Sequence, residues 1–224
     1  MKKVFLVMLM ALITVSLLVG CKDPNEDSAS VEGYIIYDCD ADNNDENGGA
    51  GPDNLMSSAC GWRYIQVAPA DATVGDVKTF QMGYYNTTGG TGDQFNTDDG
   101  IGKGNNNTDK ILATLSNRTK EYYSSSGVMD ANYCAAKVAS NYTVNGNDGW
   151  FLPSLAELKL MWAKRAKLGM NAETYLSSTE NGYDVKVVSA STTTGDSVNR
   201  GYKGSVRAVR YISEKSGVDL TQSL

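Results

Sequence analysis

One stretch in the second half of the chain combines an apolar segment with a helical pattern of apolar residues. Ser154 stands just before an apolar run and Glu157 follows it three residues later, an arrangement typical of a capping box. Pro153 restricts the residue before it to an extended conformation, and Gly169 suits the end of a helix. The pattern predicts a buried strand or tight loop followed by a core helix. The apolar positions of that helix are Leu155, Leu158, Met161, Trp162 and Ala166.

Alternating and β-branched segments predict strands on both sides of this helix. A further helix is expected from Thr108 to Asn117, with Thr108 as its N-cap, and a helical pattern runs from Met129 to Tyr142. Ser191 to Asn199 is expected to be a loop, and the polar residues after Glu214 a fraying tail. Together these elements predict an α+β domain that is rich in loops. The expected strands are Val31–Tyr37, Gly61–Ala68, Thr79–Tyr85, Tyr175–Thr179, Tyr183–Ala190 and Ser205–Ile212.

The first residues resemble a bacterial lipoprotein signal. Lys2 and Lys3 precede an apolar run that is short for a membrane span and ends Leu-Val-Gly-Cys at Cys21. The alternative is an ordinary secretory signal with a chance cysteine. Lipidation of Cys21 would anchor an exported protein to the cell envelope. Because Lys22 is not aspartate, the usual sorting rule places it in the outer membrane or on the cell surface.

These boundaries divide the chain into four parts: a signal peptide (1–20), a flexible tether (21–30), one domain (31–213) and a C-terminal tail (214–224). Without the signal, 18 Lys and Arg stand against 26 Asp and Glu, since two of the 20 basic residues leave with it, which gives a net charge of about −8. This charge argues against binding to nucleic acid. The chain has no histidine, so it lacks Ser-His-Asp and Cys-His catalysis. No pair of carboxylates is marked as catalytic, and no enzyme is expected.

An acidic segment begins at Asp38. Asp38, Asp40 and Asp42 have the alternate spacing of a calcium loop, but Asn43 and Gly49 stand where that loop requires glycine and glutamate. A solvated loop is the favoured interpretation, with a Ca²⁺ site as the alternative, and no cofactor is required.

Two cysteines bracket the acidic segment. In an oxidising compartment, Cys39 and Cys60 are expected to form a disulfide. Cys134 is expected to be a buried thiol, although its pairing with either of the others stays open.

Several segments together resemble a known family. The chain is similar to the DUF1566 family, also called the Lcl C-terminal domain family, over nearly all of residues 31–212. Phe151 stands where the Trp-Arg-Leu-Pro signature of that family has arginine. The resemblance implies a C-type lectin-like fold, with two or three helices packed on twisted antiparallel sheets, in exported proteins; one member is implicated in binding sulfated glycosaminoglycans. The segments are Gly33–Tyr37, Gly61–Tyr64, Ala68–Asp71, Ile101–Gly104, Asn107–Thr108, Cys134–Ala136, Gly149–Leu158, Ser177–Glu180 and Val206–Arg210.

The function expected from these features is a membrane-anchored surface lipoprotein with a non-catalytic, adhesin-like binding domain. Its ligand would be a glycan or a host protein, although the sugar motifs of calcium lectins are absent. The alternative is a structural or assembly component of the cell envelope. The basic residues near the last strand could also be ordinary solvated or salt-bridged charge, and the tyrosines sheet packing. The candidate ligand-binding residues are Tyr183, Arg200, Tyr202, Lys203 and Arg207, with Arg210 completing a basic strip.

Overall fold

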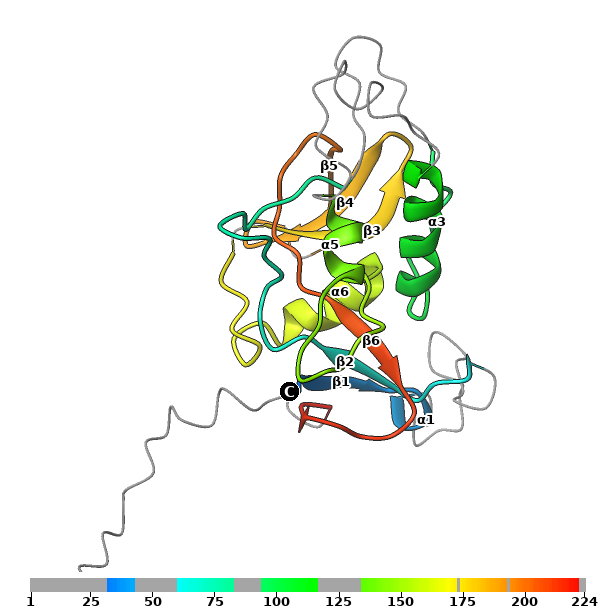
Figure 1. Ribbon diagram of the computed structural model, residues 1–224, viewed down its shortest axis with the longest axis vertical. Helices are drawn as coiled ribbons and strands as arrows, with labels where there is room; N and C mark the ends of the chain where they lie inside the picture. The colour runs from blue at the N-terminus through cyan, green and yellow to red at the C-terminus, as the bar shows by residue number, and fades with distance from the viewer. Residues whose placement is uncertain are drawn as a thin grey trace, which may run out of the picture.

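The computed structural model describes residues 32–42, 60–82, 94–116, 134–172, 174–192 and 194–221. Cys21 and the expected tether lie outside this part of the chain. The described elements form two sheets with helices between and beside them, which confirms the α+β class (Figure 1). No helix in the described ranges is long and apolar enough to cross a membrane.

The first sheet has the strand order β6-β2-β1-β7. Its centre is the antiparallel pair β1 (Tyr34–Asp38) and β2 (Tyr64–Val67), and β6 (Val209–Ile212) adds antiparallel to β2. β7 (Val218–Asp219) pairs in parallel with β1, and the backbone N–H of Leu220 donates to the carbonyl of Ile35 (2.8 Å). The stretch after residue 213, expected to be a fraying tail, therefore contributes an edge strand, which its polar sequence did not indicate.

The second sheet has the order β3-β4-β5 and is antiparallel. β3 (Thr174–Asn181) is longer at both ends than the strand expected at Tyr175–Thr179, and β4 (Asp184–Ser189) is one residue shorter at each end than the strand expected at Tyr183–Ala190. β5 (Asp196–Asn199) lies inside the segment expected to be a loop. Its sequence, Asp-Ser-Val-Asn, has low β propensity, so pairing with β4 rather than local preference makes it a strand.

The central helix, α6 (Leu155–Ala163), begins as the sequence predicts. Ser154 is its N-cap, and the reciprocal hydrogen bonds of a capping box join Ser154 and Glu157. The expected helix at Thr108 begins earlier, because α3 spans Gly104–Ser116. Thr108 is therefore not an N-cap: it is buried inside the helix, and its hydroxyl oxygen accepts a hydrogen bond from Leu152 N–H (3.0 Å). The remaining helices are α1 (Cys39–Asp42) and α5 (Ala135–Ser140), the latter capped by Cys134.

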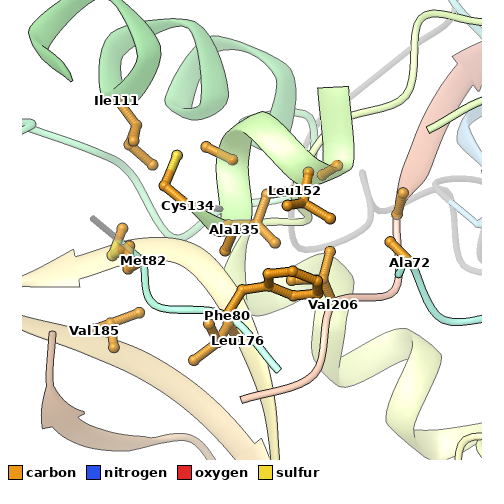
Figure 2. Close-up of a cluster of buried hydrophobic side chains, with 14 of the residues drawn as sticks. Ala72, Phe80, Met82, Ile111, Cys134, Ala135, Leu152, Leu176, Val185 and Val206 are labelled. Atoms are coloured by element: carbon orange, nitrogen blue, oxygen red, sulfur yellow. The ribbon is translucent and has the colours of Figure 1, made fainter. Parts of the chain in front are cut away.

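Two hydrophobic clusters lie on opposite faces of the second sheet. Leu176, Val185 and Val187 belong to a cluster with Phe80, Met82, Cys134 and Leu152 (Figure 2). Tyr175 and Val188 belong to the other, with Leu158 and Trp162 of α6. Phe80 and Gln81 make only isolated bridges, so the strand expected from Thr79 is not formed in its described part.

Candidate functional site

One end of the second sheet presents a row of polar side chains to solvent. Residues paired directly across antiparallel strands point to the same face, and alternate residues along a strand do so too. Asp184 pairs with Asn181 and Asn199, and Lys186 pairs with Ser197. The side-chain amide of Asn181 donates to Ser197 Oγ (3.0 Å), which places these groups on one face. We call Asn181, Asp184, Lys186, Ser197 and Asn199 the polar face.

The polar face is the part of this side of the sheet that α6 leaves uncovered. Further along β4, Val188 lies on the same face and is buried in the cluster that α6 covers. Tyr183 lies in the turn that joins β3 to β4, directly before Asp184 in the chain, and is 42% exposed. This end of the sheet therefore combines an exposed ring with amide, hydroxyl, carboxylate and ammonium groups, a set that suits a hydroxyl-bearing ligand.

A buried ion pair supports the sheet from its other side. Arg200 Nη2 lies 2.6 Å from Glu180 Oε2, and their side chains are 1% and 8% exposed. The guanidinium also donates to the carbonyl of Gly182 (3.0 Å) in the turn that carries Tyr183, and it stacks over the ring of Phe95 at 4.5 Å. Burial lowers the pKa of Arg200, and the charge of Glu180 opposes that shift. Arg200 therefore positions the turn rather than presenting a charge at the surface.

The other arginines of the expected strip are also internal. Arg207 is buried, with Nε 2.6 Å from Asp71 Oδ1, and its Nη1 donates to the carbonyls of Ala68 (3.1 Å) and Leu168 (3.0 Å). Arg210 is buried too; it donates to Gln66 and lies over the Trp150 ring. Because the guanidinium groups bind separate internal partners, the expected basic strip does not form on the surface, and Arg200 and Arg207 are not available to a ligand there.

Tyr202 and Lys203 are exposed but lie apart from the polar face. The Tyr202 hydroxyl donates to Thr174 Oγ1 (3.1 Å), at the first residue of β3, whereas Tyr183 follows the last residue of that strand. Thr174 lies on the same face of β3 as Leu176, which belongs to the hydrophobic cluster on the face of the sheet opposite to the polar face. The strand separates the two tyrosines by roughly 20 Å. Lys203 is adjacent to Tyr202 in the chain.

Sequence reasoning missed most of the polar face. Of its residues, only Asp184 and Lys186 lie in a predicted strand, and their alternation with Val185 and Val187 was the available signal. Ser197 and Asn199 carry no such signal, because they reach the face through β5.

Glu157 is a second concentration of polar contacts, buried at the start of α6. Its carboxylate accepts from Ser154 N–H (2.8 Å) and from Gly102 N–H (2.9 Å), and the Tyr211 hydroxyl donates to it. Burial raises the pKa of Glu157, and these donors oppose the shift. A Cβ at Gly104 would collide with the carboxylate, which explains the glycine at the start of α3. The site thus ties two helix N-termini to β6 and has a structural role.

Two aspartates of the alternative Ca²⁺ site lie beside an arginine. Asp38 Oδ1 lies 3.0 Å from Arg63 Nε, and Asp40 Oδ2 lies 3.5 Å from the same nitrogen. The side chain of Asp42 and the segment after it lie outside the described residues. Within those residues, no group of three or more His, Cys, Asp or Glu side chains could hold a metal ion.

The thiols of Cys39 and Cys60 are neighbours, joined by a side-chain hydrogen bond in their reduced form. Burial, followed by the contact with Cys60, raises the pKa of Cys39 to about 12. If the chain is exported, as its lipobox predicts, this pair enters an oxidising compartment, and we expect a disulfide between Cys39 and Cys60. Peptide mapping of the unreduced protein checks this, and Cys134, which caps α5, is the control that should stay a thiol. A Cys134-linked peptide would contradict the pairing.

Comparison with known proteins gives no relative: no family model, no curated protein and no solved structure matches this chain.

Proposed function

We propose that the chain is a membrane-anchored bacterial surface lipoprotein whose domain binds a ligand without catalysis, and that the polar face with Tyr183 is its binding surface. The observation that carries this proposal is the exposure of Tyr183 in the turn at the same end of the second sheet as five polar side chains. Among the described residues, the exposed large hydrophobic side chains are Val77, Tyr183, Tyr202 and Val218, and Tyr183 is the one in that turn. An exposed ring next to hydrogen-bonding groups is typical of sites for sugars and for protein hot spots.

The charge of the surface favours a neutral ligand. On the polar face, the carboxylate of Asp184 offsets the ammonium of Lys186, and no arginine of the described ranges is exposed there. A sulfated polyanion would need several exposed cations, and the arginines expected to supply them are internal. A neutral, hydroxyl-rich glycan matches the donors, acceptors and ring that are present.

The proposal extends to the family and fold that the sequence resembles. The DUF1566, or Lcl C-terminal, resemblance and a C-type lectin-like arrangement agree with two small sheets and few helices. Trp150, Phe151 and Leu152 are buried, and so are Arg207 and Arg210. Their positions agree with family motifs that stabilise the fold. The lipid anchor at Cys21 and the outward location rest on the lipobox and lie outside the described residues.

A glycan and matrix-protein array probed with the detergent-solubilised full chain tests the binding surface. For a ligand that binds, Tyr183→Ala should weaken affinity about tenfold, since an interface aromatic of this kind contributes over 1 kcal/mol. Tyr202→Ala is the matched control, because Tyr202 is 40% exposed against 42% for Tyr183 and its hydroxyl binds Thr174, at the other end of β3.

Loss of binding with Tyr202→Ala instead of Tyr183→Ala would place the binding site near the other end of β3. A blank array with verified folded protein would favour the structural or assembly role in the envelope. Crosslinking in cells would then be expected to capture a fixed partner or a second copy of the chain.

A further inference from the structure

The end of α6 and the turns after it carry a concentration of positive charge. Lys159, Lys164, Arg165 and Lys167 occur between Glu157 and Glu173, and no acidic residue interrupts that interval. The side chains of Lys159, Arg165 and Lys167 are exposed. In a chain whose net charge is −6, this is a local reversal of sign. We call these three exposed residues the basic turn.

The basic turn is held in place by packing beneath it. Arg165 lies over the Trp162 ring, with Cζ 5.1 Å from the ring centroid, and Nη1 donates to the Trp162 carbonyl (3.4 Å). Leu168 and Met170 are buried in the same core as Trp162. Arg207 donates to the carbonyl of Leu168 (3.0 Å) and so fixes the backbone after the turn. The charges therefore project from a rigid base.

The basic turn lies on the side of the domain where β1 begins. The helix α6 contacts β1, and Leu168 and Met170 share their core with Leu220, whose N–H donates to Ile35 (2.8 Å). Figure 1 shows the turn after α6 and the start of β1 on the same, left side of the molecule. A lipid anchor at Cys21 would therefore enter the domain from the side that carries the basic turn.

The length of chain between anchor and domain limits how the domain can turn. Ten residues lie between Cys21 and Glu32, and the eleven Cα–Cα steps reach at most roughly 38 Å when fully extended. A domain of this size is about 40 Å across. The side near Glu32 is therefore the side that most often faces the membrane, and tethering raises the effective concentration of lipid headgroups there.

We propose that the basic turn docks on the anionic phospholipid surface to which the protein is anchored. Lys159, Arg165 and Lys167 pair with the phosphate groups, and the polar face is thereby held in a fixed orientation relative to the membrane. This inference rests on the lipid anchor of the proposed function, and it does not depend on the glycan ligand. Each basic residue at such a surface contributes an attraction that corresponds to roughly a fivefold change in an equilibrium constant.

The test is lysine acetylation of the mature lipidated protein reconstituted in vesicles, read residue by residue by mass spectrometry. One set of vesicles is phosphatidylcholine alone, and the other contains about 30% phosphatidylglycerol, a source of negative surface potential. Lys159 and Lys167 should be acetylated roughly fivefold more slowly on the anionic vesicles. About 0.5 M NaCl should remove the difference by screening. Lys103, exposed directly before α3, is the internal control and should not change, because α3 lies on the right side of the molecule in Figure 1.

Three outcomes would contradict the inference. Equal rates for Lys159 and Lys167 on both vesicles, with the protein anchored to each, would remove the docking surface and leave the lipid anchor intact. Slowing of Lys103 by the same factor would show a general effect of the vesicle surface rather than docking through the basic turn. Protein that fails to stay with either kind of vesicle would overturn the anchor and the docking together.

Discussion

Replacing Glu157 with alanine is expected to lower the free energy of unfolding by about 4 kcal/mol, because it leaves several buried donors without an acceptor. The carboxylate receives hydrogen bonds from Ser154 N–H and Gly102 N–H and from the Tyr211 hydroxyl. These donors belong to the start of α6, to the turn before α3 and to β6. One truncation thus loosens three elements, and urea unfolding followed by circular dichroism measures the cost.

Two variants separate this role from simple helix capping. Ser154→Ala removes the reciprocal cap and should cost about 1 kcal/mol. Tyr211→Phe removes one donor while keeping the ring stacked on Trp62 (centroids 4.3 Å apart), so it should also cost less than Glu157→Ala. If Ser154→Ala and Glu157→Ala had equal effects, the carboxylate would act only as a cap of α6.

The pH dependence of stability follows from the same burial. Burial raises the pKa of Glu157 above its ordinary value of 4.5, so the folded protein binds a proton at this residue more readily than the unfolded chain does. The contribution of Glu157 to stability therefore decreases as pH rises above about 4.5 and the carboxyl ionises. Glu157→Gln, which cannot ionise, should remove this component from the curve of unfolding free energy against pH.

The sequence predicted those parts of the fold that local chemistry determines. The capping box at Ser154 and Glu157 is set by residues close in the chain, and the structure confirms it. The predicted start of α3 was wrong, because glycine has low helix propensity and Gly104 gave no helical signal. The helix nevertheless begins there, since the Glu157 carboxylate leaves room at that position for glycine alone. β5 and β7 were missed because each is a strand only through pairing, β5 with the neighbouring strand β4 and β7 with β1 from the other end of the described chain. Local propensity cannot report a partner that lies elsewhere in the chain.

The candidate site was predicted less well than the fold, for a related reason. Arginines near a terminal strand were interpreted as a surface strip, but charge in a sequence does not show whether an acidic partner is buried beside it. Asp71 lies 136 positions from Arg207 and still forms its ion pair. Tyr183 and Tyr202 were equal candidates on sequence alone, and only the structure shows that they lie at opposite ends of β3.

Replacing Arg200 with methionine is expected to lower the free energy of unfolding by about 3–5 kcal/mol, because it leaves the carboxylate of Glu180 buried without its cation. Glu180 is 8% exposed and also accepts hydrogen bonds from the backbone of Phe95 (2.8 Å) and Asn96. Lys203→Met, three residues further on at an exposed position, is the control and should change stability by less than about 0.5 kcal/mol.

The double variant Glu180→Gln, Arg200→Met distinguishes the loss of a partner from the loss of packing. Glutamine carries no charge, but its single carbonyl oxygen can accept from only one of the Phe95 and Asn96 N–H groups, which contact different carboxylate oxygens of Glu180. Part of the stability lost in Arg200→Met should therefore return. An additive loss would instead show that Arg200 acts through its stacking on Phe95 and its bond to the Gly182 carbonyl. In that case Arg200→Met should also disturb the turn that presents Tyr183, and ligand binding would fall with stability. Recovery of stability without recovery of binding would assign Arg200 two separable roles, one toward Glu180 and one toward the turn.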